Sequence, residues 1–552
     1  MKKSPLMIGT FLGLWMLALF AYGSRLVQLV AASRTVVELA LLFAYSAMLV
    51  VFWLLSAYYV AVMVFSFAAK PVPPVQPSPH GQEPRVAILY LTCNDFQLEA
   101  AKRCLGQHYP RFHLFLLDDS TKSESQAKVQ AFHRAHPKRT TVVRRPTRRG
   151  FKAGNLNHAL DGVAADYPLF VIVDADGKLP PDFLRRAVPY MRDPDVAFVQ
   201  ANHAPNPDHS SLFARDIAPT ILPFWQVHCR ARNRYGFVVF LGHGAVVRRS
   251  AWEAASGFPE VITEDLAFSA ALAQNGMRGL FLEDLICYED FAPSYAAFKT
   301  QQERYLVGVT QVIRRHLLPL LRSKNVTTVE KIDFLLWCSP LYVPVLVLSF
   351  VALTGLGLAT VFGYWHAPEI SLLGHKIALP PIRAFGEPFD IFWYRDFQIL
   401  SVFCALSPAL AAIGLGLTRR LKVFRLLLLS TVPYLSLMVV AWRGLLRYLI
   451  LGEVSWVPTG DRGATWRSPL GWELGIGSVL CAASLVTLNF AFVAVSGCLL
   501  LGAGISALGW DNRFLRLASA LCFAVILFQM ALNVVLPAQF SGLAPLVFPI
   551  HF

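Results

Sequence analysis

Long apolar stretches at both ends of the chain restrict what it can fold into. The first two occupy residues 6–30 and 36–67, and each contains one charged residue. About 18 consecutive apolar residues with few charges are enough for a transmembrane helix. A cleaved signal peptide is shorter and is not followed at once by a second span. We therefore predict two uncleaved transmembrane helices in residues 1–69.

Apolar blocks return in the second half of the chain, at residues 334–362, 397–417, 426–451, 474–508 and 515–535. The mixed segment between the two groups has roughly 250 residues, which suits one α/β domain. We predict a polytopic α-helical membrane protein with this domain inserted between its helices. The predicted segments are a proline-rich linker (70–84), a cytoplasmic α/β domain (85–292), interfacial helices (293–333), transmembrane and interfacial helices (334–451) with an external loop (364–396), a loop (452–468) and C-terminal transmembrane helices (469–552).

Basic residues predict the orientation. Lysine and arginine in short loops mark the cytoplasmic side of a membrane protein. Lys2 and Lys3 precede the first apolar stretch, and the basic segment 418–425 follows the fourth. Two spans therefore return the chain to the cytoplasm before the central domain. Residues 474–508 show no clear turn, so one long helix and two shorter ones both remain open.

The formal net charge of +15 indicates anionic partners such as lipid headgroups, phosphates or nucleic acid. We find no nucleic-acid-binding motif, and the basic residues cluster at membrane edges and near the carboxylates of the central domain. We therefore predict no nucleic-acid partner. The nine cysteines form no C-x-x-C pair, which is typical of small apolar side chains in a reducing compartment.

The central domain alternates strand and helix patterns. Strands are predicted at residues 85–92, 112–120, 140–146 and 167–176, with helical patterns between them. This alternation predicts a mostly parallel sheet with helices on both faces. Ligands of such sheets bind at the carboxyl ends of the strands. Four aspartates lie at that edge: Asp118, Asp119, Asp174 and Asp176.

Carboxylates that share a site repel one another unless positive charge is supplied. A divalent cation that also binds a diphosphate would supply it, and Mg²⁺ or Mn²⁺ suits oxygen ligands. The sequence D-A-D-G at residues 174–177 is also compatible with a simple acidic turn.

Five short segments occur in a fixed order: LLDDS, RRGFKAGNLNHAL (148–160), VDAD, the segment 242–272 with Thr263-Glu264-Asp265, and QQERY (301–305). In this order they resemble the membrane-embedded, processive family 2 glycosyltransferases, such as cellulose, hyaluronan and curdlan synthases. The resemblance covers roughly residues 85–465. It implies a GT-A fold for the central domain and transfer from a nucleotide-sugar.

The resemblance also implies roles for individual residues. Asp265 is expected to be the general base, which removes the proton of the acceptor hydroxyl, with Glu264 and Thr263 beside it. Asp176, together with Asp174, is expected to bind the metal, Mg²⁺ or Mn²⁺. The residues expected to bind the nucleotide-sugar are Thr92, Asp118 and Asp119 (one of the two at the uracil), Lys152 (at the diphosphate), Asp174, Gln301 and Arg304. The residues expected to bind the acceptor are Gly242, His243 and Tyr305.

Several of these residues have structural alternatives. Thr263 or Glu264 can simply cap the helix that begins there. Gln301 and Arg304 lie three residues apart and share one face of a helix, but a basic helix on the membrane surface has the same pattern. Tyr305 replaces the tryptophan that is usual in this family. The smaller ring speaks against a cellulose or hyaluronan product.

Residues 452–466 resemble the gating loop of these synthases, with Trp456, Thr459 and Arg462 as its aromatic, hydroxyl and basic residues. Pro458 and one extra residue depart from the pattern. In the family this loop binds diphosphate, so it must be cytoplasmic. A full span at residues 426–451 would place it outside. We therefore predict that residues 426–451 lie at the membrane surface, and a full span remains the alternative.

A polar polysaccharide cannot cross hydrocarbon unaided. The resemblance implies a processive, inverting enzyme that polymerises a β-glycan from a UDP-sugar and exports it through its own channel. UDP-glucose and a β-glucan exopolysaccharide are the specific prediction. The expected partners are the donor, the growing polysaccharide, the lipid bilayer of a bacterial inner membrane and accessory export subunits. A non-processive transferase that adds a single sugar to a lipid-linked or short glycan, and a nucleotide-sensing transporter, are the alternatives.

Overall fold

The computed structural model describes residues 3–366 except 78, 80, 209 and 210, short pieces between 369 and 414, and residues 423–452, 470–487 and 490–535. The predicted gating-like residues Trp456, Thr459 and Arg462 lie outside the described residues, as does most of the predicted external loop.

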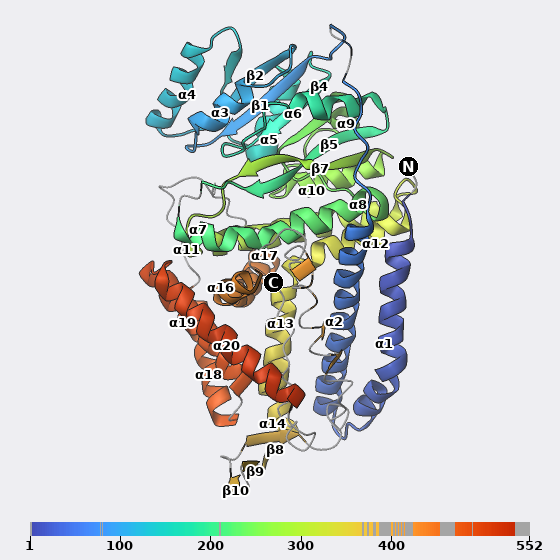
Figure 1. Ribbon diagram of the computed structural model, residues 1–552, viewed down its shortest axis with the longest axis vertical. Coiled ribbons are helices and arrows are strands. Elements are labelled where there is room, and N and C mark those ends of the chain that lie inside the picture. The colour runs from blue at the N-terminus through green and yellow to red at the C-terminus, as the bar shows by residue number, and fades with distance from the viewer. Residues whose placement is uncertain are drawn as a thin grey trace.

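The α/β domain lies at one end of the molecule, and long apolar helices fill the other end (Figure 1). Helix α11 (Tyr295–Arg322) runs between the two parts, directly below the sheet in this view. The N-terminus lies at the same level, where Lys3 Nζ donates hydrogen bonds to the backbone carbonyls of Arg232 and Asn233. The start of the first helix therefore contacts the α/β domain, and the side of the membrane on which both lie stays a prediction.

Seven strands form the sheet of the α/β domain, in the order β3-β2-β1-β4-β6-β5-β7. Only β6 pairs in the antiparallel sense, with β4 and β5. The strands are β1 (Val86–Thr92), β2 (Phe112–Asp118), β3 (Thr140–Val143), β4 (Leu169–Val173), β5 (Val196–Pro205), β6 (Ala245–Arg248) and β7 (Arg278–Glu289). The prediction of a mixed, mostly parallel sheet is confirmed.

Helices cover both faces of this sheet, so its central strands are apolar on both sides. Val86, Ile88 and Tyr90 of β1 belong to one hydrophobic core, while Ala87 and Leu89 belong to the other. The covering helices include α3 (Leu98–Leu105), α4 (Ser123–Ala135), α5 (Phe151–Asp161), α6 (Phe183–Ala187), α9 (Arg249–Ala254) and α10 (Glu264–Gln274). Apolar side chains fill both cores. Asp118, Asp174 and Asp176 lie at the carboxyl ends of β2 and β4.

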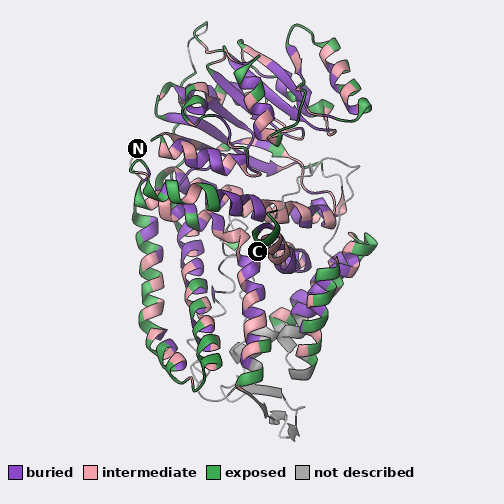
Figure 2. Cartoon of the chain, turned by 180° about the vertical axis from the view of Figure 1, so that it is seen from behind, coloured by how far each residue is buried: buried purple, intermediate pink, exposed green. Residues whose placement is uncertain are grey.

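The first two helices are α1 (Leu6–Ala31) and α2 (Val36–Ala68), within one residue of the predicted spans. Thr35 caps α2 by accepting a hydrogen bond from the backbone N–H of Glu38. Side chains such as Leu17 and Phe20 are exposed on α1, which fits contact with lipid (Figure 2). Among the described residues, three helices are long and apolar enough to cross a membrane: α1, α2 and Phe424–Leu451. The chain is a membrane protein.

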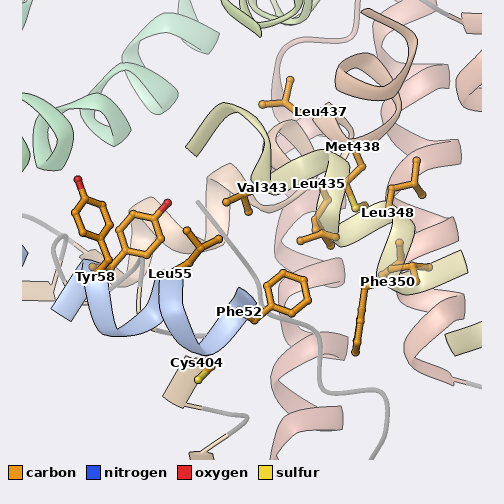
Figure 3. Close-up of a cluster of buried hydrophobic side chains, with 14 of the residues drawn as sticks. Phe52, Leu55, Tyr58, Val343, Leu348, Phe350, Cys404, Leu435, Leu437 and Met438 are labelled. Atoms are coloured by element: carbon orange, nitrogen blue, oxygen red, sulfur yellow. The ribbon is translucent and has the colours of Figure 1, made fainter. Parts of the chain in front are cut away.

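A bent pair of helices, Thr328–Leu341 and Val343–Leu358, would make a fourth span if it is counted as one. It contains α12 (Thr328–Cys338) and α13 (Val343–Ala352). Figure 3 shows the apolar cluster where α13 meets α2 and the later helices. In it, the rings of Phe52 and Phe350 lie edge to face, with 5.4 Å between their centroids.

Residues 423–451 form α16 (Val423–Leu435) and α17 (Leu437–Leu451). Figures 1 and 2 show α16 nearly end-on, whereas α1 and α2 are seen lengthwise, so α16 runs across them. The location of residues 426–451 at the membrane surface stays a prediction. Within 474–508, the described residues form two helices, α18 (Leu470–Thr487) and α19 (Phe490–Leu508), which are followed by α20 (Arg513–Val535).

Charged side chains join the α/β domain to the membrane helices as matched pairs. Arg232 on α8 (Cys229–Tyr235) lies 3.0 Å from Asp333 on α12, and both residues are at most 1% exposed. The hydroxyl of Tyr58 on α2 donates to the same carboxylate at 3.2 Å. Lys299 on α11 pairs with Glu473 on α18 at 2.6 Å.

Candidate active site

The D-A-D-G loop follows β4 and is held by the end of β7. Lys178 and Tyr288 exchange backbone hydrogen bonds of 2.8 and 3.2 Å. The backbone N–H of Asp290 donates to Asp176 Oδ2 at 3.1 Å. This pairing brings the residues after β7 next to the two aspartates of the loop. The site is therefore built from strand ends that lie more than 100 residues apart in the sequence, between Asp176 and Asp290.

Lys152 connects the loop to two other predicted segments. Its Nζ lies 2.7 Å from Asp174 Oδ1 and 3.4 Å from Glu264 Oε1, and it donates to the carbonyl of Gly242 at 3.1 Å. The helix that carries it, α5, starts after Gly150, whose φ of +72° favours glycine. The structure thus brings together four residues that the motifs predict for one site.

Glu264 and Asp265 form an acidic turn at the start of α10, beside Lys152. Asp265 Oδ1 accepts a hydrogen bond from the backbone N–H of Leu266 at 2.8 Å. Gly242 has a φ of +87°, and a Cβ there would lie 3.3 Å from Asp265 Oδ2 and 3.5 Å from Lys152 Nζ. A side chain at position 242 would therefore enter the space between the expected base and the lysine.

Thr263 occupies the N-cap position of α10, but its side chain makes no capping hydrogen bond. Its hydroxyl is buried and has no hydrogen-bond partner in the part of the chain that the structure describes. The alternative in which Thr263 is simply a helix cap is therefore wrong.

Burial and nearby charges shift the pKa values of the carboxylates in this site. Burial raises the pKa of Asp176 to about 7; His243 opposes this shift, and Asp174 and Glu289 add to it. Burial also raises the pKa of Asp265 above its ordinary value. For Asp174, burial is outweighed by Lys152 and His243, which hold its pKa below the usual value.

A second polar group lies beside the D-A-D-G loop. His243 Nε2 is 2.9 Å from Glu289 Oε2, and His203 Nδ1 is 3.4 Å from the same oxygen. The two imidazole rings stack with their centroids 4.2 Å apart. His203 is on β5 and Glu289 ends β7, which are paired in parallel. His243 is thus held from two sides.

Helix α11 carries Gln301, Arg304 and Tyr305 and packs on the acidic turn. A Cβ on Gly308 would lie 2.6 Å from Thr263 Cγ2, and Gln311 Oε1 accepts a hydrogen bond from the backbone N–H of Ile262. The guanidinium of Arg304 lies over the ring of Tyr305, 5.5 Å from its centroid. The face of α11 that was predicted to bind sugar therefore adjoins the helix that carries Asp265.

The residues expected at the nucleotide base lie farther along the sheet edge. Asp118 pairs with Arg144 at 2.8 Å, and Asp119 pairs with Arg145 at 2.6 Å. Thr92, at the end of β1, donates to Asp95. Arg145 also donates to the carbonyl of Phe151 and so links this group to α5.

Sequence reasoning missed His203, Glu289 and Asp290. Asp290 accepts from Gln97 Nε2 at 3.0 Å and Asn206 Nδ2 at 2.8 Å, so its carboxylate is fixed. One signal was available: polar residues interrupt the apolar run of β5, and Gln200, Asn202 and His203 are all buried. Buried polar side chains in a strand indicate a hydrogen-bonded network or a site.

The residues present fit a divalent cation. Asp176 has no lysine or arginine within ion-pair distance among the described residues, although Asp174, Glu289 and Asp290 lie close enough to shift its pKa. Such a surplus of buried negative charge is stabilised by a bound metal ion. Carboxylate oxygens are the ligands that Mg²⁺ and Mn²⁺ accept.

A family model matches most of the chain. The family model described as "Glycosyl transferase family group 2" matches residues 169–536, about two thirds of the chain. The chain belongs to this family. The prediction of a family 2 glycosyltransferase, with an α/β GT-A domain between transmembrane helices, is confirmed.

Two of the curated relatives come from plants. A probable glucomannan 4-beta-mannosyltransferase 1 of Arabidopsis thaliana is 30% identical over 244 residues, 43% of this chain and 44% of the relative. Glucomannan 4-beta-mannosyltransferase 1 of Oryza sativa subsp. japonica is 28% identical over 246 residues, 43% of this chain and 47% of the relative. The matched part therefore spans less than half of each relative.

Among solved structures, the mannosyltransferase PcManGT from Pyrobaculum calidifontis, in complex with GDP-Man and Mn²⁺, is similar with a TM-score of 0.49 and 21% identity. The match covers 74% of this chain and 99% of that chain.

Proposed function

We propose that the chain is a processive, inverting hexosyltransferase that polymerises a β-glycan from a nucleotide-sugar and passes the product to its membrane helices. One observation carries the proposal. Lys152, Asp174, Gly242 and Glu264 meet at one sheet edge, and α11 lies between that edge and the membrane helices. A donor at this edge and an acceptor along α11 would meet at Asp265.

The chemistry follows from the charges. Asp265 takes the proton of the acceptor hydroxyl as that oxygen attacks the anomeric carbon of the donor sugar. The new carbon–oxygen bond forms on the face opposite the bond that breaks to the diphosphate, so the configuration inverts. Lys152 meets the negative charge that develops on the departing diphosphate. Leu266 fixes the Asp265 carboxylate through its backbone N–H.

A divalent cation, Mg²⁺ or Mn²⁺, fits beside Asp176 and Asp174, and when bound it supplies positive charge to the diphosphate. Without it, the buried carboxylates would repel a donor that is itself anionic.

The identity of the sugar is the finer part of the proposal. The family resemblance predicts UDP-glucose and a β-glucan, and Tyr305 in place of the family's tryptophan favours a glucan outside the cellulose pattern, such as a β-1,3 or mixed-linkage product. The names of the curated relatives support a mannosyl unit instead. Both donors carry a diphosphate and a hexose, so the described cluster suits either. We also propose that the enzyme is in the inner membrane of a bacterium, with its catalytic domain in the cytoplasm and with accessory export subunits.

Product length tests processivity. Purified protein in proteoliposomes is incubated with Mn²⁺ and, in separate reactions, UDP-glucose, GDP-mannose, GDP-glucose or UDP-N-acetylglucosamine. We expect a long polymer from one donor, and linkage analysis then identifies it. Products of one or two sugars would replace this proposal by the non-processive alternative. Nucleotide binding without any sugar transfer would favour the transporter.

A further inference from the structure

The orphaned nitrogen of His243 has a defined environment. The residue is 5% exposed, and its Nδ1 is buried with no geometrically acceptable hydrogen-bond partner among the described residues. Burial lowers the pKa of the ring, but Cys287 and Glu289 outweigh burial and raise it. A Cβ on Gly177 would lie 3.3 Å from Nδ1. Gly177 directly follows Asp176, so this nitrogen adjoins the D-A-D-G loop, and a side chain at position 177 would crowd it.

The other nitrogen of His243 is already used. Nε2 lies 2.9 Å from Glu289 Oε2, so in the neutral ring Nε2 is the donor and the lone pair is on Nδ1. Histidines that bind metals usually donate their second ring nitrogen to a carboxylate, which fixes both the tautomer and the ring. Glu289, His243 and the loop after β4 have this arrangement.

We propose that His243 Nδ1 and Asp176 coordinate the same divalent cation, with Glu289 and His203 as positioning residues for the His243 ring. The proposal rests on the proposed function, because it concerns the cation that accompanies the donor diphosphate. It adds a nitrogen ligand to a site that the sequence predicts to contain only oxygen ligands.

A nitrogen ligand changes the choice of metal. Mg²⁺ favours oxygen ligands in near-octahedral geometry, whereas an imidazole nitrogen favours first-row transition ions. Of the two cations predicted from the sequence, the site therefore prefers Mn²⁺.

A separate metal held by His203, His243 and Glu289 is a weaker reading, although their ligand atoms all lie within 4.8 Å of one another. Glu289 Oε2 already lies within ion-pair distance of both imidazoles. His203 also contacts Gln200 Nε2 at 3.2 Å and the carbonyl of His243 at 3.1 Å, so its nitrogens are satisfied.

Electron spin echo modulation of bound Mn²⁺ tests this directly. Untagged full-length protein in detergent is loaded with one equivalent of Mn²⁺, without donor, and ¹⁴N modulation is recorded. We expect nitrogen modulation in the wild type, its loss in His243→Asn and its retention in His158→Asn, which changes an exposed histidine on α5. If His243→Asn does not fold, wild-type protein labelled with ¹⁵N-histidine shows whether the nitrogen ligand is a histidine, and His203→Asn then separates His203 from His243.

Metal titration supplies a second readout. We expect His243→Asn to weaken Mn²⁺ binding about 10–100-fold and Mg²⁺ binding much less. Mn²⁺ bound without nitrogen modulation would overturn the inference and leave the oxygen-only cation of the proposed function. Modulation that His203→Asn abolishes and His243→Asn retains would also overturn it. Wild-type protein that binds no Mn²⁺ would overturn both the inference and the cation itself.

Discussion

The D-A-D-G end of the sheet edge and the junction with the membrane helices both bury charge, but only the junction pairs each of the compared carboxylates with a cation. Farther along the edge, Asp118 and Asp119 have arginine partners. At the junction, Arg232 faces Asp333 and Lys299 faces Glu473, one cation for each carboxylate. At the D-A-D-G end of the edge, Lys152 pairs with Asp174 and Glu264 and lies near Asp265, whereas Asp176 has no lysine or arginine within ion-pair distance among the described residues. Matched pairs fix how two parts of a protein pack, whereas a surplus of one charge prepares a site for a ligand of the opposite charge.

Removal of the expected base should have the largest effect on the unbalanced region. We expect Asp265→Asn to reduce the rate of sugar transfer by about 10²–10⁴-fold, because no base then removes the proton from the hydroxyl of the acceptor sugar. Its thermal stability at neutral pH should stay the same or rise, since burial disfavours the charged carboxylate. Initial rates and unfolding curves measure both. Asp284→Asn, which alters an exposed carboxylate on β7, is the matched control. Full activity in Asp265→Asn would contradict the proposed role of Asp265 as the general base.

Breaking a matched pair should give the opposite result. We expect Arg232→Met to destabilise the protein by about 3–5 kcal/mol, because it leaves Asp333 buried without its cation. Nucleotide binding per folded molecule should be unchanged. Thermal unfolding and ligand titration check these two outcomes. The double variant Arg232→Met with Asp333→Leu should recover most of the stability, and a failure to recover would show that the pair does more than balance charge.

Activity and stability should depend on pH in opposite ways because of Asp265. Asp265 must be deprotonated to act, and its pKa is raised by burial, so kcat/KM should fall about tenfold per pH unit below that raised pKa. Stability should move the other way. A folded-state pKa above the unfolded one gives a contribution that is complete below the unfolded pKa and is lost as the pH rises through the folded pKa. Rate profiles and melting temperatures across the acid range, for the wild type and Asp265→Asn, measure both trends. If the melting temperature of Asp265→Asn depends on pH in the same way as that of the wild type, the trend comes from groups other than Asp265.

The smallest expected effect concerns Tyr305. Aromatic contacts of this kind contribute about 0.5–1.5 kcal/mol beyond burial, so Tyr305→Ala should raise KM for a short acceptor by roughly 2–12-fold. Tyr305→Trp should keep or lower it. Acceptor titrations at saturating donor test this prediction. An unchanged KM in Tyr305→Ala would place the acceptor away from this face of α11.

The sequence predicted much of the fold because its strands and helices have local patterns. The apolar runs before Asp118 and Asp174 predicted β2 and β4, and the motifs predicted which carboxylates would face one site. The ligands of that site were harder to predict. Glu289 reaches His243 only because β7 pairs with β5 and because Lys178 and Tyr288 form a bridge. Such contacts depend on sheet order, which no single stretch of sequence specifies.

Two local details were also beyond the sequence. Thr263 matched the pattern of a helix cap, but α11 packs so closely on it that Gly308 contacts its methyl group and the hydroxyl remains unpaired. Gly242 looked like one more acceptor residue, whereas its backbone conformation keeps the space between Lys152 and Asp265 open. Both details arise from packing between distant segments.

Nucleotide binding with and without a divalent cation tests the central claim most directly. The purified full-length protein is titrated with UDP and with GDP at constant ionic strength, once with Mn²⁺ and once with EDTA. If surplus carboxylates at the sheet edge hold a cation for the diphosphate, at least one nucleotide should bind tightly with Mn²⁺ and at least tenfold more weakly with EDTA. Asp176→Asn should lose most of the difference. Equal affinity in Mn²⁺ and EDTA for the nucleotide that binds would contradict the account.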